Sequence, residues 1–453
     1  MTECTAEQSY GLNDPQRQRL ALEALLGEPS PSWLVALAFV DGVTDLARFH
    51  DALAELARAY PVLRTTFVME GPRESWHQRI RGCHEIWSSP PLIYQLPKVS
   101  SWDELIEAME PDLEGRNPDY RYAAAYGTDD DGCLRVAFAF DHMAFDIRSI
   151  DIVLAYLARS LGGGDGSAPA GSCRCGRNDF VSFIERTAAL ADNSPLPERY
   201  EWAHDLMLAA RSPHAFVSLP VAVPMSVMQA GGTTRYRSRF VTDPSVRHSY
   251  TPFAAFVSAL TISLEVNFES PALFYAPSLN RLPAEMDSVG WFAGTPILPV
   301  HSKPILSAVT AGRILDAAGA TSEVKAATTE AMADGALLTT IVHRKISEAL
   351  GGGRLPYMDC LPDSMPYIIL GFVDHLRGHR EWKANDVTVR RAPLAAAASP
   401  PPLVPPGYTL VRLHRVKKGQ WSVEVDYETE RYKSGAIEAL MASTEGYLRQ
   451  LLG

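Results

Sequence analysis

The chain has little cysteine, with six in 453 residues and no repeated pair spacing. Structural zinc sites and disulfide frameworks use wider, regularly repeated pairs, so Cys173 and Cys175 are interpreted as loop thiols. His375 and His379 stand four residues apart, but Gly378 and the lack of an H-E-x-x-H pattern favour a solvated loop over a metal site. We therefore expect no bound metal and a reducing, cytoplasmic location.

Long apolar runs and a surplus of basic residues are also absent. No run approaches membrane-spanning length, and the N-terminus has no basic stretch followed by an apolar one, as a secretory signal would have. The net charge is -11, which argues against general nucleic-acid binding, because phosphate contacts need clustered Lys and Arg. We expect neither a membrane nor a nucleic acid among the partners.

The chain does have enough apolar residues for large cores. Hydrophobic residues make up 46% and charged residues 21%, which is ordinary for a globular protein. A length of 453 residues is too great for one ordinary core, so we predict two lobes. The stretch 162–176 is rich in Gly, Ser and Ala and predicts a flexible connection. The predicted lobes are therefore 1–178 and 179–453.

Hydrophobic periodicity predicts mixed helix and strand in both lobes. Apolar residues share a helical face in 44–61 and again in 147–161, whereas 135–142 alternates like a buried strand that ends at His142. This places His142 at a strand-to-helix junction, where side chains face clefts.

In the second lobe, Thr251–Pro252 predicts a helix start. A strand is expected over 421–427 and a closing helix over 437–451, whereas the Ala- and Pro-rich stretch 395–407 cannot hold regular structure.

The segment with the clearest chemistry is 141–146, Asp-His-Met-Ala-Phe-Asp. The imidazole of His142 titrates near neutral pH, and the carboxylate of Asp146 follows four residues later across a turn. Taken alone, a histidine beside carboxylates is more often a satisfied structural residue than a catalytic base. The interpretation therefore depends on other segments of the chain.

This segment resembles the HHxxxDG motif of the condensation domains of nonribosomal peptide synthetases and their relatives, the carnitine and chloramphenicol-type acyltransferases. His142 and Asp146 match the second His and the Asp, and Ser149 aligns with the Ser of the extended form HHxxxDGxS. Two positions depart from the motif. Asp141 stands at the first His, and Ile147 stands at the Gly.

Five other segments resemble elements of the same family, in the family's order, over essentially the whole chain. They are 60–67 (RHExLRTxF), 251–256 (TPxxxLLAAF), 277–281 (PVAGR), 289–298 (IGFFVNTLPLR) and 425–429 (xxYNTxLF). The resemblance implies an α/β (α+β) fold of two chloramphenicol-acetyltransferase-like lobes. They would form a V-shaped pseudo-dimer around a central tunnel, with His142 at its middle.

The resemblance also implies roles for individual residues. His142 would be the general base or hydrogen-bonding orienter for an acceptor that attacks a thioester, a role worth about 10²–10⁴-fold in rate. Asp146 would be structural and pair with Arg281, which fixes the loop that carries His142. Ser149 is either an active-site neighbour or a helix-start residue, and Trp291 either contacts substrate or belongs to the core.

The two departures bear on catalysis. If the carboxylate of Asp141 points inward, it raises the pKa of His142, whereas strand alternation predicts that it points away. Ile147 lacks the conformational freedom of glycine and adds bulk where the loop turns.

These features together predict a freestanding condensation enzyme that acts in trans as a monomer. It would transfer an acyl or aminoacyl group from the phosphopantetheine thioester of a carrier protein to an amine or alcohol, forming an amide or ester in secondary-metabolite or antibiotic biosynthesis. No permanently bound cofactor is expected. Two alternatives remain open: an acyl-coenzyme A donor, or a catalytically silent module that docks carrier proteins or recruits a tailoring enzyme.

Overall fold

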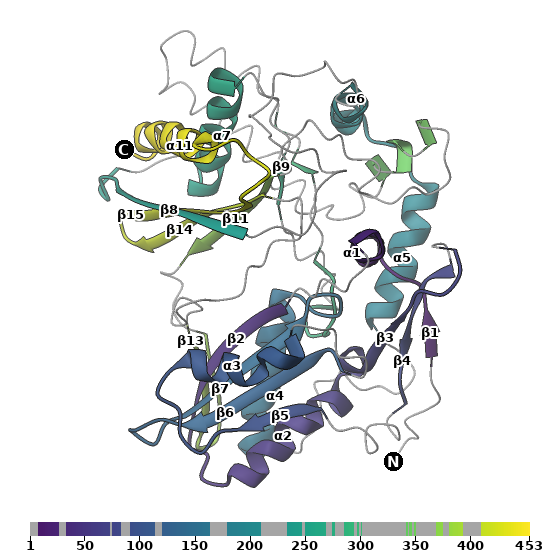
Figure 1. Cartoon of the computed structure of the whole chain (residues 1–453), viewed down its shortest axis with the longest axis vertical. Coiled ribbons are helices and arrows are strands. Elements are labelled where there is room, and N and C mark those ends of the chain that lie inside the picture. Colours follow the sequence, from purple (N-terminus) through teal and green to yellow (C-terminus); the bar gives the residue numbers. More distant parts are fainter. Residues whose placement is uncertain are drawn as a thin grey trace. The chain divides into compact units, whose positions relative to one another are not determined.

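Contacts within the chain divide it into two compact units (Figure 1). The first unit comprises Met1–Ala189, Arg281–Phe292 and His379–Leu403, and the second comprises Leu190–Asn280, Ala293–Gly378 and Val404–Gly453. A computed structural model describes residues 8–26, 33–72, 75–82, 91–113, 120–163, 179–209, 233–246, 250–268, 274–276, 285–293, 297–298, 300, 341–342, 344–346, 348–349, 368–374, 380–392 and 409–453.

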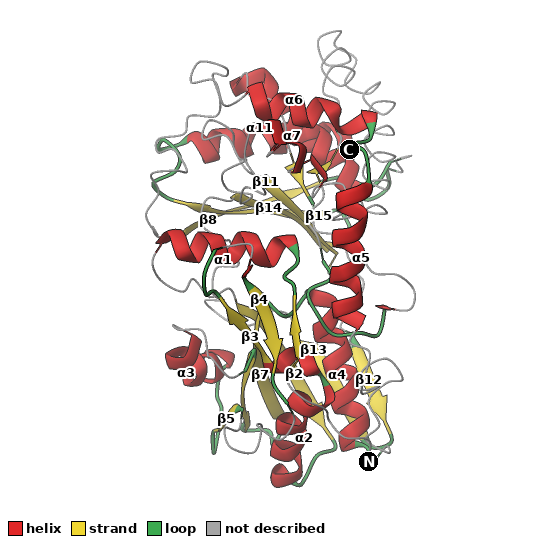
Figure 2. Ribbon diagram, turned by 90° about the vertical axis from the view of Figure 1, so that its right-hand side faces the viewer, coloured by secondary structure: helices red, strands yellow, loops and turns green. Residues whose placement is uncertain are grey.

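The first unit is built on a six-stranded sheet of order β12-β13-β2-β7-β6-β5, in which only the β5–β6 pair is parallel. Its strands are β2 Trp33–Asp41, β5 Leu92–Gln95, β6 Tyr122–Thr128, β7 Leu134–Asp141, β12 Glu381–Ala384 and β13 Val387–Ala392. Helices α2 (Leu46–Ala59) and α4 (Ile147–Leu161) pack on one face, and α3 (Trp102–Leu113) packs on the other (Figure 2).

Strand β7 lies at the centre of this sheet and is buried on both faces. Phe138 and Phe140 pack in the same core as α2 and α4, whereas Ala137 and Ala139 pack with α3. The alternation predicted for the strand that leads to His142 is therefore confirmed.

Smaller elements complete the first unit. A three-stranded antiparallel sheet has the order β1-β4-β3, with β1 Gln8–Tyr10, β3 Thr65–Val68 and β4 His77–Ile80. The 3-10 turn η1 (Pro61–Arg64) precedes β3. Helix α1 (Asp14–Leu26) follows β1, and α5 (Asp179–Asn193) runs from the first unit into the second.

The second unit is built on a six-stranded sheet of order β10-β9-β11-β14-β15-β8. Its strands are β8 Thr233–Val241, β9 Phe274–Tyr275, β10 Ile297–Leu298, β11 Ile368–Asp374, β14 Thr409–Lys417 and β15 Gln420–Glu428. Helices α7 (Pro252–Phe268) and α11 (Ala436–Leu452) pack on one face, while the turn η4 (Glu198–Tyr200) and α6 (Glu201–Ala209) lie earlier in the unit. Thr251 caps α7 as predicted, because its Oγ1 accepts the N–H of Ala254 at 3.1 Å.

Both units combine a mixed sheet with packed helices, so the predicted two-lobed α/β class is confirmed. Each unit, however, combines three separate stretches of the sequence, so the division does not fall at one boundary near residue 178. The physical reason is that β13 pairs with β2 and β12 pairs with β13, which extends the first sheet. The V shape and the tunnel remain predictions.

Several sequence predictions fall outside the described residues. They concern the cysteine pair, the histidines at 375 and 379, most of the connection 162–176 and the stretch 395–407. Among the described helices, none is both long and apolar enough to span a bilayer.

Candidate active site around His142

The segment 141–146 forms a tight turn between β7 and α4, at the predicted strand-to-helix junction. The N–H of Ala144 donates to the carbonyl of Asp141 at 3.0 Å, and the N–H of Met143 donates to Asp141 Oδ1 at 2.9 Å. Asp141 thus fixes the turn through both its backbone and its side chain.

His142 lies on this turn with its two ring nitrogens in different surroundings. Nδ1 is 2.8 Å from the carbonyl oxygen of Phe145. Because a carbonyl only accepts, this contact assigns the proton to Nδ1 and leaves the lone pair on Nε2. Nε2 has no hydrogen-bond partner among the described residues. The ring is partly buried, and its centroid lies 4.7 Å from that of Trp291.

These surroundings favour the neutral imidazole. Burial lowers the pKa of His142 below its ordinary value of 6.5, because the charged form loses hydration. The hydrogen bond to Phe145 and the negative charge of Asp146 oppose this effect in part, and the positive charge of Arg19 adds to it. A neutral imidazole with a lone pair on Nε2 can accept a proton from a bound nucleophile.

The carboxylate of Asp141 engages Arg121 and not the imidazole. Oδ2 lies 3.1 Å from Nη1 of Arg121, and both side chains are almost fully buried. Arg121 also donates from Nε to the carbonyl of Thr65 and stacks over the ring of Phe67. The negative charge of Asp141 is therefore compensated by the buried Arg121. The sequence analysis did not predict this pair.

Asp146 is the N-cap of α4. Its Oδ1 accepts the N–H of Ser149 at 2.8 Å, and its Oδ2 accepts the N–H of Phe292 at 3.2 Å. The hydroxyl of Ser149 lies 2.8 Å from Asp146 Oδ1 and 2.9 Å from the carbonyl of Gly290. Asp146 and Ser149 thus join the start of α4 to the segment that carries Trp291. The predicted partner Arg281 lies outside the described residues.

Ile147 occupies the first position of α4 and is 59% exposed. Asn385 is the sole non-glycine residue with positive φ in the described part of the chain, so Ile147 has a backbone conformation open to any residue. The loss of the motif's glycine therefore costs no backbone strain at this turn.

Two polar residues at the start of α1, Asn13 and Gln16, also hold the turn that carries His142. Asn13 and Gln16 form a reciprocal capping box, in which each side-chain oxygen accepts the other's backbone N–H, at 2.8 and 3.0 Å. Nε2 of Gln16 donates to the carbonyl of Met143 at 2.8 Å, and Nδ2 of Asn13 donates to the carbonyl of Trp291 at 3.2 Å. Asn followed three residues later by Gln is a capping signal, but these distant contacts are not readable from the sequence.

Comparison with known proteins finds similarity in structure and not in sequence. No family profile and no curated protein matches the chain. The epimerization domain from the third module of tyrocidine synthetase B superposes with a TM-score of 0.66 at 13% identity, covering 100% of this chain and 99% of that one. The SgcC5 protein from Streptomyces globisporus gives 0.65 at 15% identity and 98% of each chain. The X-domain from teicoplanin biosynthesis gives 0.66 at 14% identity, covering 100% and 95%.

Proposed function

Because the chain has the fold of the condensation superfamily, as its motifs predicted, we propose that it transfers an acyl or aminoacyl group from a thioester to an amine or alcohol. The observation that carries the proposal is the state of His142. Its Nδ1–H is bonded to Phe145, its Nε2 has no hydrogen-bond partner among the described residues, and burial lowers its pKa, which favours the neutral ring. The fold alone does not select this activity, since the similar structures include an epimerization domain and an X-domain.

In the proposed reaction, Nε2 of His142 accepts a hydrogen bond from the N–H or O–H of the acceptor. The acceptor attacks the thioester carbonyl, and its proton passes to Nε2 as the tetrahedral intermediate forms. Collapse of the intermediate breaks the C–S bond, and the departing thiolate takes the proton. The carbonyl of Phe145 continues to accept from Nδ1–H when the ring is charged, which supports the imidazolium. Such help contributes about 10²–10⁴-fold for an alcohol and less for a neutral amine.

We propose the phosphopantetheine thioester of a carrier protein as donor, supplied in trans. An acyl-coenzyme A thioester has the same reactive group and is the alternative. A variant of the starter condensation domain of rhizomide synthetase, which superposes at a TM-score of 0.61, was solved in complex with C8-CoA. Both donors carry the acyl group on the same phosphopantetheine arm, so an assay is needed to distinguish them.

A second candidate is a silent module that docks a partner. It is favoured by Asp141, which stands where the resembling motif has its first histidine and is committed to Arg121. Among the similar structures, the X-domain from teicoplanin biosynthesis is found in complex with OxyB. Under this proposal the chain binds an acylated carrier protein or a tailoring enzyme without unloading the acyl group.

The deciding experiment measures the mass of acylated carrier proteins incubated with the chain and a panel of amines and alcohols. We expect unloading by the wild type and a loss of about 10²–10⁴-fold in His142→Ala. His204→Ala, which removes a histidine from α6, is the matched control and is expected to retain activity. Equal rates in wild type and His142→Ala would overturn the base assignment. Binding of the carrier protein by the wild type, with no unloading for any pair, would favour the docking module.

A further inference from the structure

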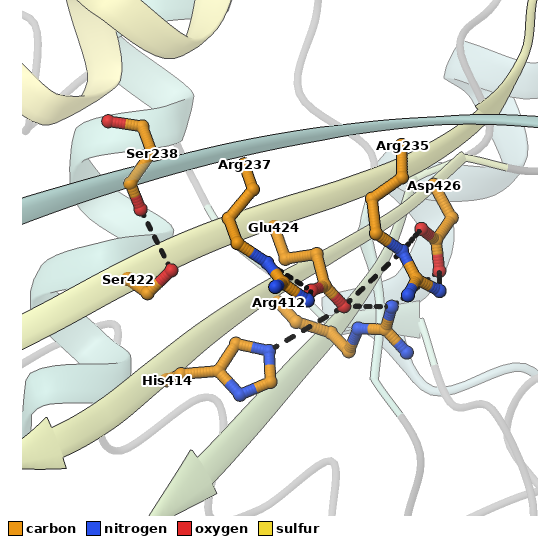
Figure 3. Close-up of polar contacts among 8 residues, drawn as sticks. All are labelled: Arg235, Arg237, Ser238, Arg412, His414, Ser422, Glu424 and Asp426. Atoms are coloured by element: carbon orange, nitrogen blue, oxygen red, sulfur yellow. Dashed lines mark hydrogen bonds and ion pairs between the residues drawn. The ribbon is translucent and has the colours of Figure 1, made fainter. Parts of the chain in front are cut away.

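The face of the second sheet that lies opposite α7 and α11 carries charged side chains in a regular pattern. The alternate residues Tyr236 and Phe240 of β8 pack with the helices, so the arginines between them lie on the other face. Cross-strand register aligns β8, β15 and β14 into three rungs, drawn in part in Figure 3. The rungs are Arg235–Asp426–Leu410, Arg237–Glu424–Arg412 and Arg239–Ser422–His414.

In the first two rungs, the two acids pair with all three arginines. Nε and Nη2 of Arg235 lie 2.5 and 3.0 Å from the carboxylate oxygens of Asp426, and Nε of Arg237 lies 2.9 Å from Glu424. Arg412 bonds to both acids from the other side (Figure 3). Burial opposes ionisation of Glu424, but the hydrogen bond from Arg237 and the charges of Arg412 and Arg235 hold its pKa below the ordinary value. Both acids are buried, and their hydrogen bonds fix the arginines in place.

The third rung has no acid of its own, although Nε2 of His414 lies 3.9 Å from Oε1 of Glu424 in the second rung (Figure 3). Ser422 occupies the central position that Asp426 and Glu424 hold in the other rungs, and its hydroxyl donates to the carbonyl of Ser238 at 2.8 Å (Figure 3). Arg239 is exposed and forms no side-chain hydrogen bond or ion pair with any described residue. Within the rungs, four arginines face two carboxylates, which leaves a local surplus of positive charge in a chain whose net charge is -11.

A second guanidinium group is available beside Arg239. Arg237 is 49% exposed, and it contacts Glu424 through Nε and Nη2 only, so its Nη1 has no partner among the described residues. Residues two apart on a strand lie on the same face at about 6–7 Å, so both guanidinium groups can reach one small anion. Guanidinium groups suit phosphate and carboxylate because their N–H donors match two oxygens at once.

We infer that the Arg239–Ser422–His414 rung, together with Arg237, binds an oxyanion: the phosphate or carboxylate group of a small molecule. Glu424 holds Arg237 in place before the ligand arrives, which reduces the entropy lost on binding. All of these residues belong to the second unit, whereas His142 belongs to the first.

The source of the oxyanion rests on the proposed function. A thioester donor carries a phosphate on its pantetheine arm, and an acceptor such as an amino acid carries a carboxylate. The two sources are separated by ligand pairs that differ only in the charged group. Phosphopantetheine is compared with pantetheine, and alanine is compared with alaninamide, which lacks the carboxylate.

Isothermal titration calorimetry of the full chain at low salt tests the site with these pairs and with inorganic phosphate. We expect the wild type to bind the charged member of at least one pair at least tenfold more tightly. Arg239→Gln removes one guanidinium group and is expected to weaken that binding about tenfold. Ser422→Asp places a carboxylate between Arg239 and His414, as in the other two rungs, and is expected to abolish it. Arg58→Gln, at an exposed pair on α2, removes the same charge and is expected to bind like the wild type.

Equal binding of charged and uncharged partners by the wild type would overturn the inference. So would wild-type affinity in both Arg239→Gln and Ser422→Asp. Circular dichroism checks that Ser422→Asp is folded, and if it is not, Arg239→Gln decides alone. The readout does not depend on transfer. A chain that binds phosphopantetheine but unloads no carrier retains this site and loses the proposed function, and a chain that unloads carriers without preferring the charged ligands does the reverse.

Discussion

Asp141 and Arg121 form a buried ion pair, with 3.1 Å between Oδ2 and Nη1. The pair occupies the place where the resembling motif has its first histidine, and it holds the turn of His142 because Oδ1 of Asp141 accepts the N–H of Met143. A carboxylate so deeply buried is tolerated when a fixed positive charge and hydrogen bonds compensate its lost hydration. The pair therefore acts as a structural brace of the turn.

This brace predicts a large loss of stability when one partner is removed. Arg121→Leu leaves the charge of Asp141 buried without its arginine, and we expect the free energy of unfolding to fall by about 3–5 kcal/mol. Urea unfolding measures the loss. Arg58→Leu breaks the exposed pair with Glu55, whose side chains are both 38% exposed, and is expected to cost less than about 1 kcal/mol. Similar losses in the two variants would show that Arg121 is not a brace.

The second prediction concerns the pH dependence of His142. Burial favours the neutral ring in the folded chain, so its pKa lies below the ordinary 6.5 of the unfolded chain. As pH falls below 6.5, His142 is protonated in the unfolded chain before it is protonated in the folded chain. The free energy of unfolding therefore decreases between pH 6.5 and the lower pKa of the folded chain. In the transfer reaction, we expect the acidic limb of kcat/KM to have its midpoint below 6.5. Rates from pH 4.5 to 8 measure it, with His142→Ala expected to lack the limb.

Trp291 tests whether burial lowers the pKa of His142, because the centroid of its ring lies 4.7 Å from that of the imidazole. Trp291→Ala is expected to move the pKa of His142 upward toward 6.5, whereas Trp291→Phe retains a ring and shifts it less. NMR titration of the imidazole follows both variants. A pKa unchanged by Trp291→Ala would mean that other groups cause the shift.

The third prediction separates the two tasks of Gln16. Gln16→Glu keeps a side-chain oxygen for the N–H of Asn13 but loses the donor to Met143 and sets a carboxylate against that carbonyl. We expect a loss of about 1–3 kcal/mol in stability and a fall in kcat larger than the change in KM, because Gln16 contacts the turn that carries His142. Stopped-flow kinetics and urea unfolding measure the two effects. Gln18→Glu, two residues along the same helix, is the matched control, and an equal response would remove Gln16 from this role.

The sequence predicted the elements whose causes are local. Strand β7 alternates between two cores, α4 begins directly after Asp146, and Thr251 caps α7, and each of these patterns spans a few residues. It did not predict Arg121 as the partner of Asp141, because these residues meet only through the pairing of β6 and β7. Likewise, Gln16 and Met143 are 127 residues apart, and no periodicity links them.

The composition of each unit from separate stretches of the sequence also depends on contacts between residues far apart in the chain. Residues 381–392 join the first sheet because β13 pairs with β2, a contact between strands some 350 positions apart in the chain. Hydrophobic alternation identifies a strand but does not say which neighbour it pairs with. The proximity of His142 and Trp291 was likewise suggested through the family resemblance and not through periodicity.

The fourth prediction tests whether Asp146 braces the turn through Arg281 as well as through Phe292. Asp146→Asn keeps an oxygen for one of the two backbone N–H donors and sets an NH₂ group against the other, so a loss of about 1–3 kcal/mol is expected from the described contacts alone. Arg281→Gln, combined with Asp146→Asn in a double-mutant cycle, measures the remaining part by urea unfolding. If the two side chains pair, their coupling energy is expected to exceed about 0.5 kcal/mol. A coupling of zero would leave Ser149 and Phe292 as the contacts that fix Asp146, and the predicted ion pair would be wrong.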